Sequence, residues 1–361
     1  MQPDVVNNLL SEITSKLKEN LSDWYGANAT LVHPPEFQPR NWSVFIRYKV
    51  NTAENEQKAI LVKIRRLRDS ELMDSINNPG LRQEGRDDYE ALKVIQGLFG
   101  ENGTQTEVKG VYCTVRPLAF FEESSALVME ELDARPLRKK FMKVKTAYQS
   151  DWQEHIAFLL KSAGRWLRIF HEQLGYMKEG PFFDNPIREI MDKNLQTVET
   201  TSRLDFSEIR KKLDSAQVKY KDMTLSHGLL HRDFNCANVL VSNDDRIGVL
   251  DFHFVNGPIY IDIAKILTDI QTYSLQSFSQ GTFINKGLMK KFHQSVLNGY
   301  FGDEAPIENA LNLYSVFAIL EKWQADEEKL LEGKDKFHIR ALAPLRRNYY
   351  MRLVTSYASK L

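Results

Sequence analysis

The chain has 361 residues, of which 42% are hydrophobic and 27% charged, as in an ordinary globular protein with room for two lobes or domains. Its 48 basic and 48 acidic residues cancel, which argues against a nucleic-acid-binding protein, because such proteins carry a basic field. With two cysteines, no apolar run of about 18 residues and no signal-peptide pattern at its start, we expect a cytoplasmic protein without disulfides or a membrane-spanning helix.

Residues 4–24 have apolar side chains at helical spacing, which predicts an amphipathic helix. Asp4 can cap its start, and Gly26 follows its end. We expect the apolar stripe to pack on the rest of the domain, with docking of a partner as the alternative.

The next segment has a strand pattern. Residues 43–50 alternate between apolar and polar side chains, and residues 59–66 are rich in Ile, Leu and Val, which predicts two antiparallel strands joined by a polar loop. Pro34, Pro35 and Pro39 predict a loop before the first of these strands.

Lys63 lies in the middle of the second apolar run, where a charged side chain requires a reason. On an edge strand its stem could cover apolar surface while its amine reaches water. The alternative is a functional role for Lys63. Residues 82–99 then predict a helix, and Asp88 falls on its apolar face.

Residues 112–121 and 126–129 predict two further strands, after which the chain becomes helical. Residues 151–174 carry a broad apolar stripe and predict a long helix. Later helices are expected at residues 187–198, 206–213, 263–273, 286–300, 307–331 and 338–359. The acidic segment 321–328 is expected to be a solvated helix face.

The most informative stretch has a hairpin pattern. Two short apolar runs, residues 239–241 and 247–250, flank a polar turn. The open ends of this hairpin carry Asn238 and Asp251, with Asp233 a few residues upstream. Closing the hairpin brings an amide oxygen and a carboxylate to a common point, and hard oxygen ligands of this kind suit Mg²⁺ that bridges substrate phosphates.

The same stretch carries two motifs. His231, Asp233 and Asn238 match the pattern H-x-D-x-x-x-x-N, and Asp251-Phe252 matches the start of D-F-G. It therefore resembles the catalytic and metal loops of the protein-kinase-like superfamily, and most closely those of the aminoglycoside phosphotransferase and choline kinase branch.

This resemblance implies an α+β, bilobal, protein-kinase-like fold with a small antiparallel-sheet N-terminal lobe and a mostly helical C-terminal lobe. Residues 1–131 would form the first lobe, from the amphipathic helix 4–24 through the sheet and one further helix. Residues 132–361 would form the second, with the catalytic and metal loops at residues 231–262.

The resemblance also implies roles for the motif residues. Asp233 would be the base that receives the proton of a substrate hydroxyl, and Asn238 and Asp251 would bind magnesium. Asp262 would be a buried structural carboxylate that braces the catalytic loop. His231 would be a packed, hydrogen-bonded residue with a structural role.

In the N-terminal lobe, Lys63 resembles the lysine of the V-A-I-K strand, which binds the α- and β-phosphates of ATP. Family members pair this lysine with an acid on the next helix. We prefer Asp88, although aspartate is shorter than the usual glutamate. Glu84, one turn earlier, is the second choice, and Glu90 points elsewhere on the helix.

Residues 127–132 resemble the hinge between kinase lobes, so backbone groups of Glu130, Glu131 and Leu132 would hydrogen-bond adenine. A glycine-rich phosphate loop is missing, because no glycine occurs between Gly26 and Gly80. The proline-rich residues 34–41 are expected to cover the phosphates instead.

The implied activity is ATP- and Mg²⁺-dependent transfer of the γ-phosphate to a hydroxyl of a small molecule, such as an aminoglycoside, choline or a sugar. No nucleic-acid or membrane partner is expected. Only ten residues separate Asp251 from Asp262, and Asn256-Gly257-Pro258 among them predict a tight turn. This leaves no room for the long segment on which protein kinases dock a peptide.

Two alternatives remain open at this point. The chain could be a pseudokinase, a nucleotide-binding module without catalysis. It could also be a metal-dependent oxygenase or hydrolase in which His231, Asp233, Asp251 and His253 bind iron or zinc.

Overall fold

A computed structural model describes residues 3–40, 42–54, 56–68, 70–100, 111–141, 150–174, 177–332 and 340–361. The chain forms two compact units. Unit 1 comprises Met1–Ala134 and Ser242–Leu250, and unit 2 comprises Arg135–Val241 and Asp251–Leu361. The expected α+β class, with an antiparallel sheet toward the N-terminus and helices toward the C-terminus, is confirmed.

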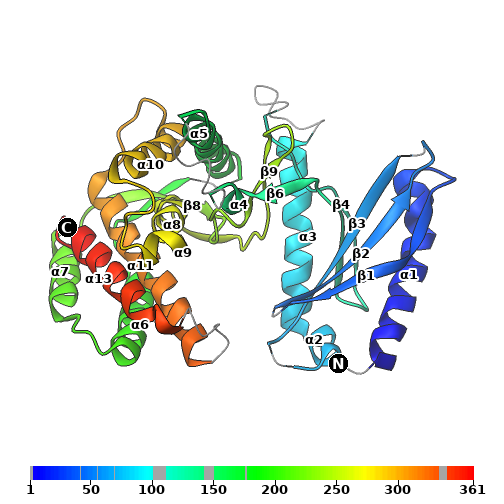
Figure 1. Ribbon diagram of the computed structural model, residues 1–361, viewed down its shortest axis with the longest axis horizontal. Coiled ribbons are helices and arrows are strands. Elements are labelled where there is room, and N and C mark those ends of the chain that lie inside the picture. The colour runs from blue at the N-terminus through cyan, green and yellow to red at the C-terminus, as the bar shows by residue number, and fades with distance from the viewer. Residues whose placement is uncertain are drawn as a thin grey trace. The chain divides into compact units, whose positions relative to one another are not determined.

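Unit 1 is built on a five-stranded antiparallel sheet in the order β1-β2-β3-β5-β4 (Figure 1). The strands are β1 (Thr30–Pro39), β2 (Ser43–Asn51), β3 (Gln57–Arg65), β4 (Pro117–Phe121) and β5 (Ala126–Glu130). Because side chains alternate along a strand, β2 and β3 each present one row of fully buried apolar residues.

Helix α1 (Pro3–Tyr25) covers that buried face of the sheet. Ile13 and Leu17 on the helix pack into the same core as Ile46 and Val62 of the sheet, and all four side chains are fully buried. The apolar stripe of the N-terminal helix therefore belongs to the core of unit 1, as expected, and is not left exposed for a partner.

Helix α3 (Pro79–Phe99) packs on the opposite face, against β3, β4 and β5, after the short helix α2 (Leu72–Ile76) (Figure 1). It begins three residues earlier than the predicted start at residue 82. Asn78 caps it by accepting a hydrogen bond from Leu81 N–H at 3.1 Å, and Pro79 occupies the first helical position, where a missing N–H costs nothing.

The loop predicted at the three prolines is wrong, because β1 runs through all of them. β1 is an edge strand that pairs with β2, and its register shifts between Val32 and Glu36. Proline lacks an N–H group, so strands tolerate it at an edge or a bulge. The phosphate cover expected at residues 34–41 therefore belongs, up to Pro39, to the sheet.

Two further boundaries differ from prediction. The strand expected from residue 112 begins at Pro117, and Tyr112 forms an isolated bridge with Ile247. Cys113 N–H donates to Ile247 O at 2.9 Å, and Ile247 N–H donates to Val111 O at 3.2 Å. These bonds explain why residues 242–250 belong to unit 1, although the sequence placed them in the C-terminal lobe.

Unit 2 is mostly helical. Its helices are α4 (Leu137–Phe141), α5 (Ser150–Leu174), α6 (Asn185–Ser202), α7 (Ser207–Lys219), α8 (Tyr260–Gln271), α9 (Ser274–Phe278), α10 (Lys286–Phe301), α11 (Glu308–Leu331) and α13 (Ala343–Ala358). The remaining strands of the chain are β6 (Ala134–Pro136), β7 (Lys178–Pro181), β8 (Thr224–Leu230), β9 (Val239–Ser242), β10 (Ile247–Val249) and β11 (Val255–Pro258). The helix predicted at residues 338–359 corresponds to α13, and its predicted first residues, 338 and 339, lie outside the described residues.

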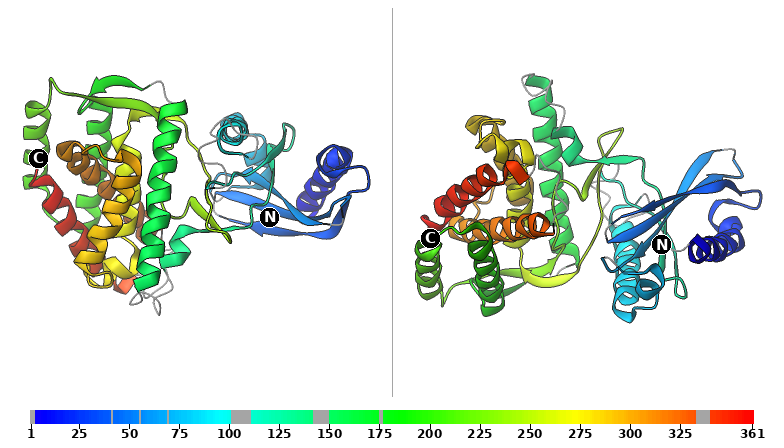
Figure 2. Two further views of the ribbon diagram at one scale, coloured as in Figure 1. Left: turned by 90° about the horizontal axis from the view of Figure 1, so that it is seen from above. Right: turned by 60° about the horizontal axis from the view of Figure 1, so that its bottom comes forward.

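Helices α5 and α10 lie along each other at very close range (Figures 1 and 2). A side chain at Gly164 would place its Cβ 2.2 Å from Val296 O, and one at Gly299 would place its Cβ 2.0 Å from Lys161 O. Glycine is therefore required at both positions for the two helix backbones to touch.

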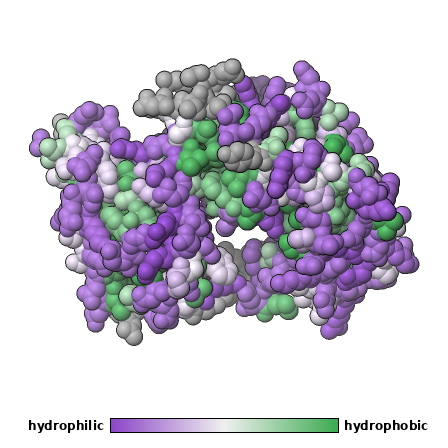
Figure 3. All heavy atoms as spheres, turned by 180° about the vertical axis from the view of Figure 1, so that it is seen from behind, coloured by the Kyte–Doolittle hydropathy of each residue, from purple (hydrophilic) through white to green (hydrophobic). Residues whose placement is uncertain are grey.

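No helix within the described ranges is long and apolar enough to cross a membrane. Hydrophilic residues dominate the face drawn in Figure 3, with smaller apolar patches among them.

Candidate active site

A pair of strands in unit 2 brings the two sequence motifs together. β8 and β11 are antiparallel, with Leu230 opposite Val255, and His253 N–H continues the contact by donating to His231 O at 3.3 Å. The segment that starts at His231 and the segment that starts at Asp251 therefore lie side by side.

The tight turn predicted at Asn256-Gly257-Pro258 is wrong, because these residues lie in β11. Gly257 faces Gly228 of β8, and a Cβ at Gly257 would lie 3.0 Å from the Leu230 side chain. A larger residue at position 257 would therefore have to displace the end of the Leu230 side chain.

The predicted hairpin turn is present between β9 and β10. Ser242 N–H donates to Arg246 O at 3.0 Å, and Arg246 N–H donates to Ser242 Oγ at 2.9 Å. Asp245 has a positive φ of 62°, which is typical of Asp in a turn.

The carboxylate of Asp233 is held at both oxygens. Asn235 Nδ2 donates to Oδ1 at 2.8 Å, and Asn238 Nδ2 donates to Oδ2 at 2.8 Å. Asn235 Oδ1 in turn accepts Ala237 N–H at 2.8 Å. The loop therefore closes on itself around a half-buried carboxylate whose orientation is fixed. Sequence reasoning missed the role of Asn235, although an asparagine side chain that accepts the backbone N–H two residues later, as Asn235 does with Ala237, is a recognisable turn pattern.

Asp262, in the first turn of α8, braces this loop. Its fully buried carboxylate accepts His231 N–H at 2.6 Å and Arg232 N–H at 2.8 Å. Burial raises the pKa of Asp262, but the hydrogen bond and charge of His171 and the interactions with His231 lower that pKa by more, so the net shift is downward. The carboxylate is thus ionised at neutral pH.

His171, at the end of α5, completes this buried network. Because the ionised carboxylate of Asp262 can only accept, His171 Nε2 donates to it at 3.2 Å. The other ring nitrogen, Nδ1, lies 2.7 Å from the hydroxyl of Tyr300 on α10. Tyr300 follows Gly299, so the close approach of α5 and α10 places this hydroxyl against the histidine.

Asp251 has a left-handed backbone, with φ at 60°, and an exposed side chain. The next residue, Phe252, is buried in an aromatic cluster, with its ring centroid 4.8 Å from that of His231 and 6.0 Å from that of Phe170. Packing of Phe252 therefore holds the strained residue before it, and strain of this kind is common at functional sites.

In unit 1, Lys63 is paired with Asp88, the partner preferred from the sequence. Lys63 Nζ lies 3.2 Å from Asp88 Oδ2, and both side chains are largely buried. Lys63 is on β3, between β2 and β5, so the edge-strand explanation for this lysine is wrong. Glu90 instead pairs with Lys93 at 3.0 Å.

Asp88 is shared with a second cation that sequence reasoning missed. Arg65 Nη2 donates to both oxygens of Asp88 at 2.9 Å, and Arg65 Nη1 donates to Glu84 at 2.9 Å. Arg65 lies two residues after Lys63, on the same face of β3, and this period-two spacing was the signal that could have found it.

Two of the three residues predicted to contact adenine already donate their backbone N–H groups to backbone oxygens. Glu130 N–H donates to Arg116 O at 2.9 Å, and Glu131 N–H donates to Ala59 O at 2.8 Å. Of the three N–H groups, that of Leu132 alone has no backbone acceptor among the residues that the structure describes. Glu130 and Leu132 also line a cavity of about 830 Å³ in unit 1, whose described lining includes neither Lys63 nor Asp88.

The donor atoms in unit 2 fit magnesium better than iron or zinc. Within the described part of the chain, no three His, Cys, Asp or Glu side chains are grouped to hold a metal. His231 is fully buried, and its Nδ1 accepts Asp233 N–H at 3.2 Å. Protein-bound iron and zinc usually need three or more such ligands, whereas Mg²⁺ uses one or two hard oxygen ligands together with substrate phosphates. The side-chain oxygens of Asn238 and Asp251 are hard ligands of the kind that Mg²⁺ uses.

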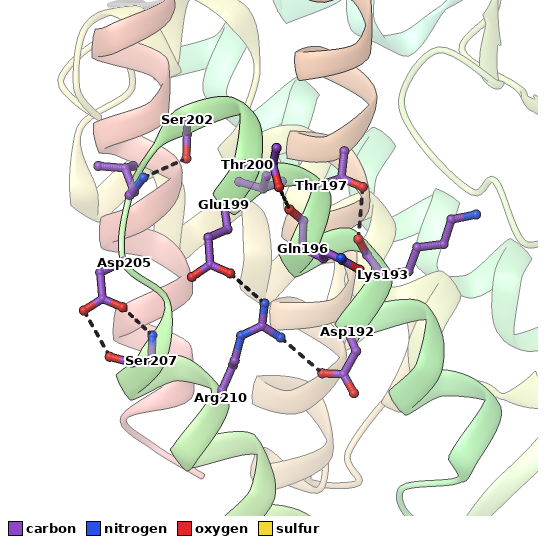
Figure 4. Close-up of polar contacts among 12 residues, drawn as sticks. Asp192, Lys193, Gln196, Thr197, Glu199, Thr200, Ser202, Asp205, Ser207 and Arg210 are labelled. Carbon is purple, nitrogen blue, oxygen red and sulfur yellow. Dashed lines mark hydrogen bonds and ion pairs between the residues drawn. The ribbon is translucent and has the colours of Figure 1, made fainter.

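A separate polar surface joins α6 to α7 in unit 2 (Figure 4). Arg210 of α7 reaches Glu199 at 2.9 Å and Asp192 at 3.8 Å, and all three line a cavity of about 630 Å³. These opposite charges face one another, which indicates a structural contact between the two helices.

The comparisons with known proteins agree with this geometry. Residues 109–287 match the model of the phosphotransferase enzyme family, a range that includes the loops at His231 and Asp251 but not Lys63. No curated protein matches the chain.

Several solved structures share the fold over nearly the whole chain. They include a choline/ethanolamine kinase family protein from Mesorhizobium loti, with 14% identity, a TM-score of 0.54 and coverage of 97% of this chain and 98% of that one. A choline kinase from Cryptosporidium parvum has 12% identity, a TM-score of 0.53 and coverage of 97% and 96%. Choline kinase LicA from Streptococcus pneumoniae has 15% identity, a TM-score of 0.50 and coverage of 96% and 99%.

At these identities the structural similarity shows the fold, and the family match adds the class of chemistry, which together support a small-molecule phosphotransferase. The protein has the protein-kinase-like fold of solved choline kinases, and its residues 109–287 match the phosphotransferase enzyme family, in agreement with the resemblance that its motifs predicted.

Proposed function

We propose that the protein transfers the γ-phosphate of ATP to a hydroxyl group of a small molecule in a Mg²⁺-dependent reaction. The observation that carries this proposal is the loop around Asp233. Its carboxylate is fixed by Asn235 and Asn238, and the whole loop lies within the residues that match the phosphotransferase family.

In this proposal Asp233 is the base. A carboxylate held at both oxygens by amide N–H groups keeps one orientation, so it can align an acceptor hydroxyl and receive its proton as the new phosphate ester bond forms. We assign His231 no chemical role in the proton transfer. Its Nδ1 accepts the Asp233 N–H, which is a structural contact with the loop backbone.

Asn238 and Asp251 would hold the magnesium, which neutralises charge on the phosphates when it is bound. Asn238 uses its nitrogen to contact Asp233, so its oxygen Oδ1 can serve as a metal ligand. In unit 1, the ion pair with Asp88 would orient Lys63 for contact with the α- and β-phosphates of ATP. The N–H of Leu132 is the backbone donor that we assign to adenine.

We propose a small acceptor because the chain between Asp251 and Asp262 is short and ordered. Residues 255–258 of this interval pair with β8, which leaves no segment for docking a peptide. The similar solved structures are of kinases named for choline and ethanolamine, and a hydroxylated compound of that size is the class that we expect here.

The first prediction tests the function itself. Incubation with ATP and Mg²⁺ should consume ATP in the presence of at least one member of a panel of aminoglycosides, amino alcohols and sugars, whereas a peptide library should accept no phosphate. Nucleotide binding without transfer to any panel member would favour a non-catalytic module instead. Efficient peptide phosphorylation would contradict the choice of acceptor.

The second prediction concerns Asp233. Asp233→Asn should lower kcat by about 100-fold or more, because an amide cannot accept the proton, while the affinity for MgATP changes little. Asp244→Asn is a suitable control, because Asp244 lies on the β9–β10 turn and contacts Ser242 and Arg246. Near wild-type activity in Asp233→Asn would refute the assignment of the base.

The third prediction concerns the metal. Asp251→Ala should abolish Mg²⁺-dependent nucleotide binding, and Asn238→Ala should weaken it less, because a charged oxygen binds a cation more strongly than an amide oxygen does. Titration calorimetry with ATP, with and without Mg²⁺, separates the metal-dependent part of the affinity. Unchanged MgATP affinity in Asp251→Ala would count against this metal site.

The fourth prediction concerns the brace. The folded-state pKa of Asp262 is depressed, so its contribution to stability is complete above the ordinary aspartate value of about 3.9 and is lost as pH falls through the lower folded pKa. Asp262→Asn should therefore reduce the free energy of unfolding at pH 7 by about 2–4 kcal/mol, and the difference from wild type should narrow as the pH falls below about 4.

Urea unfolding at both pH values measures this difference. Asp222→Asn is the matched control, because the Asp222 side chain is 87% exposed and its replacement should be nearly neutral. Equal losses for the two variants, or a gap that widens in acid, would contradict the role of Asp262.

A further inference from the structure

Arg232 separates His231 from Asp233 and has a left-handed backbone, with φ at 70°. A residue with a Cβ pays a free-energy cost in this conformation, so contacts elsewhere must hold it. One such contact is made by the backbone, because Arg232 N–H donates to Asp262 at 2.8 Å.

The side chain of Arg232 has a second set of contacts, all on helix α11. Its two terminal nitrogens lie 2.7 and 3.2 Å from the two oxygens of Glu321. Its guanidinium carbon also lies 5.1 Å from the ring centroid of Phe317, which is fully buried one helical turn before Glu321. A two-point contact fixes the plane of the guanidinium group as well as its position.

Lys265 joins this network from α8. Its amine lies 3.0 Å from Glu321, and it follows Asp262 by three residues on the same helix. The side chains of Arg232, Glu321 and Lys265 are 23%, 21% and 18% exposed, so the three charges are mostly shielded from water. The segment 321–328, predicted to be a solvated helix face, is thus largely a contact surface, because Asp326 and Glu327 are buried as well.

We propose that Glu321 is a positioning residue of the reaction. It holds the Arg232 side chain and thereby the backbone conformation that presents Asp233. This inference rests on the proposed function for its effect on catalysis, but its structural part, the control of the loop by α11, can be tested without turnover.

Helix α11 offers a matched control. Glu327 also contacts an arginine at two points, with Arg347 nitrogens at 2.8 and 2.5 Å, and it accepts Trp323 Nε1–H at 3.1 Å. It has the same chemistry on the same helix but contacts α13 instead of the catalytic loop. Glu327→Gln should lower the midpoint of thermal unfolding and leave kcat unchanged.

Glu321→Gln should instead lower kcat by about 10-fold or more with little change in the KM for ATP, because a small displacement of a reacting group costs rate more than binding. Hydrogen–deuterium exchange of residues 231–238 should become faster in Glu321→Gln and stay unchanged in Glu327→Gln.

The exchange measurement separates two failures. If wild-type protein transfers phosphate to no acceptor, the proposed function fails, and exchange alone decides the inference. Faster exchange at residues 231–238 in Glu321→Gln, with unchanged exchange in Glu327→Gln, supports the inference. Unchanged exchange in Glu321→Gln, or an equal increase in both variants, overturns it.

Discussion

Asp262 is a fully buried, ionised carboxylate, and the shape of the loop at residues 231–238 depends on how that charge is satisfied. An unpaired charge in the interior would be very costly, so His171 and the N–H groups of His231 and Arg232 must all reach it. The loop that carries Asp233 therefore takes its shape from α8.

This requirement extends to other helices of unit 2. His171 can reach Asp262 because α5 is locked against α10, and that contact needs glycine at positions 164 and 299. On the other side, Glu321 of α11 and Lys265 of α8 hold the side chain of Arg232. A loop of eight residues is thus positioned by four helices, which is why its geometry can be more exact than loop residues alone would allow.

The sequence predicted helices and strands correctly where the local spacing of apolar residues determines the structure. The apolar repeat of α1, the alternation in β2 and β3, and the helical stripe of α5 all predicted the correct element. The predictions were wrong where pairing with a strand elsewhere in the sequence determines the structure. Three prolines favour a loop locally, but pairing with β2 makes them part of an edge strand. In the same way, Asn256-Gly257-Pro258 favours a turn until β8 pairs with it.

The candidate site shows the same division. Motif spacing selected Asp233, Asn238, Asp251 and Asp262 as candidate site residues, and the structure brings Asn238 to Asp233 and Asp262 to the loop. The contact of Arg232 with Glu321 spans 89 residues and follows no period, so an acidic helix was taken for a solvated face. The sharing of Asp88 by Lys63 and Arg65 follows from the alternation of side chains along a strand, because residues two apart lie on the same face of β3.

The prolines of β1 have a consequence beyond the fold of unit 1. An exposed sheet edge is a template on which another chain can add a strand, and this is a common route to aggregation. In β1, Pro34, Pro35 and Pro39 have no N–H to offer, and the register shift after Val32 interrupts the spacing of the groups that remain. A foreign strand would find few donors there, so this edge of the sheet protects the protein against self-association.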